Sequence, residues 1–134
     1  MMMKRLLVIV SIGISLTGCF TQVRQKYAYE SWRKPGASDD EVKRALLECG
    51  YYSPFGGEYP MDQNSRALSN RCMIKYGFSQ TGYLKLSGGK TLCEDRPEIP
   101  ACQLPLDQIP DRDVAKRLNS PFCKEFPQAT VCQP

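Results

Sequence analysis

Histidine is absent from this chain, and its 134 residues include only one tryptophan. Histidine is the commonest general base in enzymes and a common zinc ligand, so its absence excludes Ser-His and Cys-His catalytic pairs and mixed Cys/His zinc sites. The sequence also lacks a G-x-S-x-G motif, and its glycine pairs lack the spacing of a phosphate-binding loop. We therefore expect a protein that is not an enzyme and binds no cofactor.

Acidic side chains leave one weak catalytic alternative. Glu94 and Asp95 lie between two cysteines, and Asp111 and Asp113 precede a short apolar stretch. A glycosidase uses such a pair of carboxylates when the two converge on one bond. Acids at a helix start or on a tight loop are ordinarily capping or solvated groups, so a hydrolase ranks third among the hypotheses.

Long apolar runs are missing as well. The most apolar segment, Leu6 to Leu16, follows Lys4 and Arg5 and is shorter than the roughly 20 residues of a transmembrane helix. A basic start, a short apolar run and small residues at its end are typical of a secretory signal peptide.

This segment ends in Leu16-Thr17-Gly18-Cys19, which resembles the lipobox of bacterial lipoproteins. The resemblance implies that Cys19 receives a diacylglyceryl group and that residues 1–18 are cleaved off as the signal peptide. The alternative is an ordinary signal peptide in which Cys19 has no role. Aspartate after the cysteine tends to retain such proteins at the inner membrane, so Phe20 implies the outer membrane of a Gram-negative cell, on either its periplasmic face or the cell surface.

Neither sign of charge dominates the chain. Without residues 1–18 it has 16 basic and 14 acidic residues, a net charge of +2. This balance does not favour nucleic acid or a polybasic membrane contact. We expect attachment to the membrane through the lipid anchor, no nucleic-acid partner and no small-molecule substrate, with an envelope protein as the candidate partner.

Cysteine, by contrast, is plentiful. Apart from Cys19, the chain has Cys49, Cys72, Cys93, Cys102, Cys123 and Cys132. An even set outside the cytoplasm indicates three disulfides. A metal site is the alternative, but no pair has the short C-x2-4-C spacing of zinc modules, so we expect no metal.

An internal repeat suggests the pairing. LCEDRPEIPACQLP and FCKEFPQATVCQP share the order apolar-C-x-acid-x-P-x4-C-Q, followed by proline. Similar sequences favour similar local closure, so we pair Cys93 with Cys102 and Cys123 with Cys132, which leaves Cys49 for Cys72. Each bridge is expected to stabilise the fold by about 2–4 kcal/mol.

Two helices are predicted before these loops. Ser38 and Glu41 match a capping box, and an apolar stripe at helical spacing ends before Gly50. A second helix is predicted from about residue 63 to residue 76, again followed by glycine and an aromatic residue. The Cys49–Cys72 bridge would staple them, so we expect a mainly α, small disulfide-stabilised domain built on a helical hairpin.

The remaining segments have weaker patterns. Residues 19–37 are expected to be a lipidated tether and residues 38–134 a single disulfide-stapled domain. Trp32 is expected to pack on the domain, with the lipid headgroup region as the alternative. The loop-rich C-terminal third is expected to contain one short helix in IPDRDVAKRLNS, and a small hairpin around Gly88-Gly89 is a further prediction.

A looser resemblance covers residues 31–78. SWRKPGAS, a cysteine at a helix end and RCMIKYGF are similar to many small Gram-negative lipoproteins. That resemblance carries no activity and does not include the doubled cysteine loop.

These observations favour a non-catalytic binding or accessory module of the cell envelope, anchored in the outer membrane. The alternative is an inhibitor or exclusion factor that acts on a foreign enzyme or particle. Stapled loops lose little entropy on docking, although small secreted domains also use them for stability alone. The candidate contacts in these loops are Arg96, Ile99, Pro100, Phe126 and Gln128.

Overall fold

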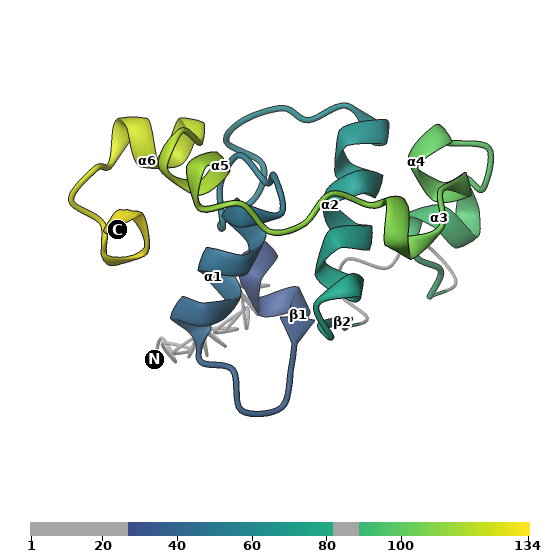
Figure 1. Ribbon diagram of the computed structural model, residues 1–134, viewed down its shortest axis with the longest axis horizontal. Coiled ribbons are helices and arrows are strands. Elements are labelled where there is room, and N and C mark those ends of the chain that lie inside the picture. Colours follow the sequence, from purple (N-terminus) through teal and green to yellow (C-terminus); the bar gives the residue numbers. More distant parts are fainter. Residues whose placement is uncertain (1–26, 82–88) are drawn as a thin grey trace, which may run out of the picture.

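The computed structural model describes residues 27–81 and 89–134, and this part of the chain is mainly α-helical (Figure 1). The two longer helices are α1 (Asp39–Glu48) and α2 (Gln63–Lys75). Shorter ones follow: α3 (Leu92–Asp95), α4 (Pro100–Gln103), α5 (Val114–Leu118) and α6 (Pro121–Glu125). The remaining elements are the 3-10 turns η1 (Ala28–Ser31), η2 (Leu106–Gln108) and η3 (Thr130–Cys132), and the strands β1 (Trp32–Arg33) and β2 (Ser79–Gln80).

Helix α1 begins at the predicted cap. The Ser38 Oγ accepts a hydrogen bond from the Glu41 N–H at 3.2 Å. The Glu41 carboxylate accepts from Arg112 at 2.9 Å, whereas a capping box would direct it toward the start of its own helix. The cap thus follows from local sequence, while the contact of Glu41 depends on a distant segment.

Both long helices end in the same way. The N–H of Tyr51 donates to the Leu46 carbonyl at 2.9 Å, and the N–H of Phe78 donates to the Met73 carbonyl at 3.1 Å. These are Schellman motifs, and each requires a left-handed residue just after the helix. Gly50 and Gly77 supply it, with φ of +102° and +85°, as the sequence predicted.

The core lies between the helices of the hairpin and includes their disulfide. Cys49 and Cys72 are bonded, with their Cα atoms 5.5 Å apart, so the predicted staple is confirmed. The buried residues of this core are Ala28, Trp32, Val42, Ala45, Leu46, Cys49, Tyr51, Cys72, Met73, Phe78 and Ile109. Burial raises the pKa of Tyr51 to about 12, and its hydroxyl donates to the side chain of Asn70.

The segment before α1, which was expected to belong to the tether, packs against the domain. Trp32 is only 2% exposed, which confirms that it packs on the domain. Strand β1 pairs antiparallel with β2, with Trp32 opposite Gln80. The N–H of Ala28 also donates to the Phe55 carbonyl at 3.2 Å. These contacts fix residues 27–33 against the hairpin.

The C-terminal part contains more helix than the sequence suggested. Only one short helix was expected there, but α3, α4, α5 and α6 all form, together with η2 and η3. Each disulfide loop starts with a short helix and closes with a second helical turn. The other two predicted disulfides are confirmed, and in both the Cα atoms are 5.3 Å apart.

The two disulfide loops repeat in backbone geometry as well as in sequence. Arg96 and Phe126 occupy equivalent positions after α3 and α6, with φ/ψ of −126°/66° and −121°/62°. The N–H of each donates at 2.8 Å to a carbonyl four residues earlier, that of Leu92 and of Phe122 respectively. The repeated sequence thus specifies a repeated local structure.

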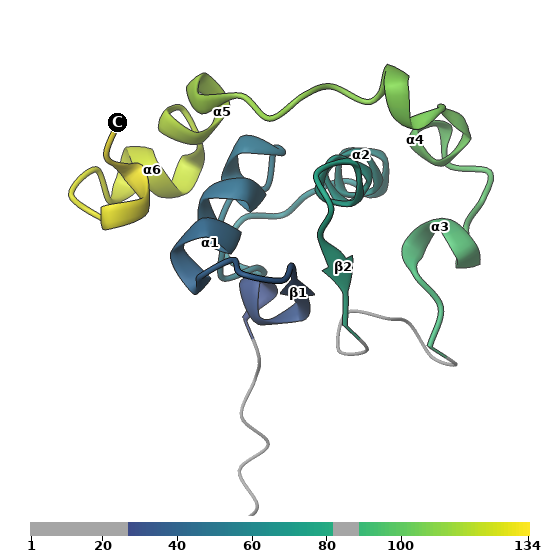
Figure 2. The same ribbon diagram turned by 60° about the horizontal axis from the view of Figure 1, so that its bottom comes forward.

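A connecting segment, residues 104–113, joins α4 to α5 and crosses the same side of α2 and α1 (Figure 2). Side chains of α2 hold this segment and the end of α4, which contains Cys102. Arg71 donates to the Cys102 carbonyl at 2.9 Å, and Lys75 donates to the Ile109 carbonyl at 2.8 Å. Lys75 also pairs with Asp111 at 2.7 Å, and this cation holds the pKa of Asp111 below its usual range.

A buried ion cluster ties α5 to α1. Glu48 accepts from Arg112 at 2.7 Å and from Arg117 at 3.1 Å. Arg117 also donates to the Val131 carbonyl at 2.6 Å. The sequence predicted that Val114 and Leu118 form the apolar side of α5. In the structure Val114 is 49% exposed, and the buried residue of this helix is Arg117.

Much of the hairpin predicted around Gly88-Gly89 lies outside the described residues, and Cys19 lies outside them as well. In residues 27–81 and 89–134, no helix combines the length and apolar character needed to cross a bilayer.

Candidate functional site

The second disulfide loop lines an apolar hollow of about 560 Å³, which we call the phenylalanine hollow. Its lining residues are Phe55, Glu58, Phe122, Glu125, Phe126, Pro127, Gln128 and Ala129. They come from the turn-rich segment between α1 and α2 and from α6 and the loop after it. The hollow thus forms where two segments far apart in sequence meet.

The local sequence of α6 positions two of the rings differently. The Ser120 Oγ caps the helix by accepting from the Cys123 N–H at 3.2 Å, and Pro121 occupies the first turn. Phe122 is buried and packs in a cluster with Leu47. Phe126 lies just after the helix and remains 47% exposed.

An aromatic row links this hollow to the N-terminal end of the described domain. The ring centroids of Phe126 and Phe122 are 5.2 Å apart, and those of Phe122 and Phe55 are 5.5 Å apart. Tyr27 meets Phe55 edge-on at 5.1 Å. Such offset and edge-on pairs stabilise aromatic clusters beyond simple burial.

Two carboxylates flank the rings. Tyr59 donates its hydroxyl hydrogen bond to Glu125, and the Ser53 hydroxyl lies 3.5 Å from Glu58. The hydroxyl groups of Tyr59 and Ser53 are neutral, so they do not balance the charge of the two carboxylates. Among the described residues, neither carboxylate forms a salt bridge, and no lysine or arginine lines the hollow.

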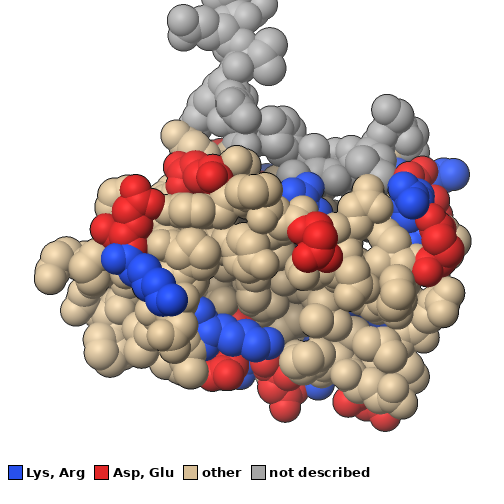
Figure 3. All heavy atoms as spheres, turned by 90° about the horizontal axis from the view of Figure 1, so that it is seen from above, with Lys and Arg blue, Asp and Glu red and all other residues tan. Residues whose placement is uncertain are grey.

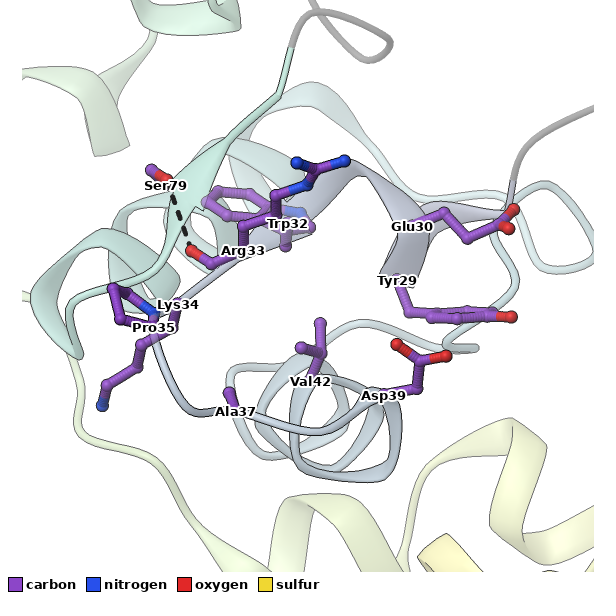
Figure 4. Close-up of a pocket in the computed structure, with 10 residues that line it drawn as sticks. All are labelled: Tyr29, Glu30, Trp32, Arg33, Lys34, Pro35, Ala37, Asp39, Val42 and Ser79. Carbon is purple, nitrogen blue, oxygen red and sulfur yellow. Dashed lines mark hydrogen bonds between the residues drawn. The ribbon is translucent and has the colours of Figure 1, made fainter.

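A second hollow, of about 660 Å³, lies between η1, β1 and the start of α1 (Figure 4). Val42 points into it, whereas the charged ends of Arg33 and Lys34 point away from its centre. Lys34 donates to the Tyr76 carbonyl at 2.9 Å, so its cation already has a structural contact. The charged groups of this hollow do not converge on one point.

The structure separates the five contacts predicted from sequence. Phe126 and Gln128 both line the phenylalanine hollow. Arg96 and Pro100 are exposed, and Arg96 pairs with Glu98, which lowers the pKa of that carboxyl. The fifth contact, Ile99, is buried.

Ile99 was expected on the surface, but it is only 6% exposed. It packs with Ala67 of α2 and with Ala101. The Ala101 N–H donates to the Asn64 side chain at 2.9 Å, which fixes the first disulfide loop onto α2. Ile99 is therefore an internal packing residue and not a contact for a partner.

Six lining residues of the hollow were not among the contacts predicted from sequence: Phe55, Glu58, Phe122, Glu125, Pro127 and Ala129. The signal for Phe55 was an aromatic residue within the turn-rich stretch YSPFGGEYP, where large apolar side chains have no helical or strand pattern to bury them. Glu125 was visible only as the acid of the cysteine repeat.

Three of the four carboxylates considered for catalysis have structural partners. Glu94 accepts from the Thr91 N–H at 2.6 Å, and Asp113 accepts from the Ala115 N–H at 2.8 Å. Asp111 pairs with Lys75, as described above. Within the described part of the chain, no group of three histidine, cysteine or acidic residues is arranged to hold a metal ion.

Surface charge is mixed. On the face seen in Figure 3, uncharged residues cover most of the area, and acidic and basic groups lie near one another. No family model, curated protein or solved structure matches this chain.

Proposed function

We propose that this protein is a lipoprotein of the outer membrane that acts as a non-catalytic binding or accessory module of the cell envelope. The anchor is Cys19, at the end of the lipobox-like Leu16-Thr17-Gly18-Cys19. One acyl chain binds a bilayer only marginally, whereas the two or more chains of such a lipid anchor hold it stably.

The observation that carries the binding role is the exposed ring of Phe126 in the phenylalanine hollow. The Cys123–Cys132 disulfide closes the loop that presents this ring. A surface that is already ordered loses little conformational entropy when it docks, so more of its contact energy appears as affinity. Aromatic anchors of this kind dominate many protein interfaces.

The short distance in sequence between Cys19 and the start of the domain at Tyr27 supports the same role. Tyr27 is eight residues after Cys19, so the anchor lies at most about 28 Å of extended chain from the domain. The Tyr27 ring touches Phe55, which lines the hollow. The phenylalanine hollow would therefore be held close to the membrane, within reach of a membrane-associated envelope protein.

The test is affinity capture of the full-length protein, tagged at its C-terminus, from native membranes. We compare the wild type with Phe126→Ser and with Val114→Ser, a matched control at an apolar side chain of similar exposure. We expect one resident envelope protein in stoichiometric amount with the wild type and Val114→Ser, and its loss with Phe126→Ser. A partnerless capture would contradict the accessory role and favour the alternative, an inhibitor or exclusion factor.

A further inference from the structure

We propose that the phenylalanine hollow takes an arginine side chain from an apolar segment of the partner. The guanidinium would lie between Glu58 and Glu125, and the aliphatic stem would lie against Phe122 and Phe126. This inference rests on the proposed function, because it specifies the partner chemistry of the same surface.

Charge complementarity is the first argument. Glu58 and Glu125 flank the hollow, and their hydrogen-bond partners are the neutral hydroxyls of Ser53 and Tyr59. Both carboxylates are exposed, and other exposed carboxylates such as Asp111 and Glu98 are each paired with a cation. Two unmatched carboxylates beside apolar rings present a negative potential that a cation from outside would complement.

The aromatic row gives the second argument. Lys43 already lies near its inner end. Its Nζ is 5.9 Å from the Phe55 ring centroid and 4.5 Å from that of Tyr29, whose ring meets Phe55 edge-on. Among the described residues, no cation lies over Phe122 or Phe126 at the outer end. Cations bind the faces of aromatic rings, arginine more often than lysine.

Arginine fits both features better than other occupants. Its planar guanidinium presents several donors and forms paired hydrogen bonds with carboxylates, while its three-carbon stem covers apolar surface. A purely apolar side chain would desolvate the two carboxylates without replacing their water. An anionic lipid headgroup would be repelled by them.

The probes are three fluorescently labelled peptides, acetyl-Gly-Leu-X-Leu-Gly-amide, with X as arginine, citrulline or leucine. Citrulline keeps the shape of arginine and removes its charge. Binding to the full-length lipoprotein in detergent is measured by fluorescence anisotropy. We expect the arginine peptide to bind about tenfold more tightly than either control, a difference typical of one charge-assisted contact.

Protein variants then assign the preference to the two carboxylates. Glu58→Gln/Glu125→Gln is expected to abolish the arginine preference. The leucine peptide is expected to bind this variant at least as tightly as the wild type, because it no longer desolvates two carboxylates. Asp95→Asn/Asp107→Asn removes the same charge from exposed positions outside the hollow and is expected to keep the preference. The retained binding of the leucine peptide shows that the first variant is folded.

Equal binding of the three peptides, tighter binding of the leucine peptide, or no binding of the arginine peptide at millimolar concentration would overturn the proposal. None of these results decides the proposed function, which the affinity-capture experiment tests separately. A partner lost with Phe126→Ser would keep the binding role and remove only the arginine assignment.

Discussion

At the scale of single residues, Glu48 joins α1 to the C-terminal part of the domain through ion pairs. It is buried in α1 and accepts from two arginines of the C-terminal part, Arg112 and Arg117. Arg117 is itself buried and also donates to the Val131 and Gln133 carbonyls. The cluster therefore joins α1, α5 and the end of the chain through one carboxylate.

Replacing Glu48 tests this role. Glu48→Gln leaves the buried Arg117 without its counter-charge, and breaking a buried ion pair in this way costs about 3–5 kcal/mol of unfolding free energy. Urea unfolding followed by circular dichroism measures the change. Glu41→Gln is the control, because Glu41 pairs with Arg112 at a more exposed position, where such pairs contribute roughly 1 kcal/mol or less. Equal losses in the two variants would contradict the account.

At the scale of elements, the helix ends and disulfide loops follow local rules. Gly50 and Gly77 end the two long helices in the same conformation. The two disulfide loops share the same cysteine spacing and the same backbone turn. The repeated elements share their local backbone geometry but pack against different neighbours. Substitutions at matched positions therefore separate the energetic cost of the local geometry from that of the packing.

Gly50→Ala is one such substitution. Alanine in the left-handed conformation costs about 1–2 kcal/mol, and a Cβ at this position would also lie 3.1 Å from the Ser69 Oγ. Gly36 also has a positive φ, but a Cβ there would have no atom within 4 Å, so Gly36→Ala isolates the backbone cost. Thermal unfolding is expected to show the larger loss for Gly50→Ala; a larger loss for Gly36→Ala would refute the steric contribution.

The two short disulfides make a second matched pair. Both close loops of the same length, with a sequence separation of 9, so their removal is expected to cost a similar entropic contribution of about 3 kcal/mol. Cys123 and Cys132 are buried, whereas Cys93 and Cys102 are half-buried. We therefore expect Cys123→Ala/Cys132→Ala to lose more stability in urea than Cys93→Ala/Cys102→Ala. The reverse order would contradict the packing of the second loop against α1.

At the scale of the whole molecule, the proposed lipid anchor at Cys19 would decide where the domain is located. Cys19→Ala removes the proposed acceptor of the diacylglyceryl group, so the domain is expected to leave the membrane fraction or remain as an uncleaved precursor. Cell fractionation with immunoblotting, and labelling with radioactive palmitate, measure the two effects. A processed Cys19→Ala chain that stays in the membrane fraction would refute the lipobox interpretation.

The sequence was sufficient for the parts of the fold that depend on neighbouring residues. Ser38, the glycine after each long helix and the cysteine repeat all specify local geometry, so the hairpin and the three disulfides were predictable. The contact between Glu48 and Arg117 joins residues 69 positions apart. No local pattern encodes such a contact, and the arginine in fact interrupts the apolar pattern expected of α5.

In the candidate site, too, the residues set by local sequence were predictable, and those brought together only by folding were not. Phe126 and Gln128 were predictable because they lie in a stapled loop, where side chains are presented in a fixed geometry. Phe55 and Glu58 come from the turn-rich segment between α1 and α2, and only the folded arrangement brings them to the same hollow. Ile99 was misassigned because its loop also has an inner side, which packs on α2.

The most direct test of the binding role is site-specific photo-crosslinking in living cells. The photoreactive residue p-benzoylphenylalanine is placed at position 126 in one protein and at the similarly exposed position 114 in another. If the phenylalanine hollow binds an envelope partner, irradiation gives one discrete adduct from position 126 and none from position 114. No adduct from position 126, or the same adducts from both positions, would contradict the account.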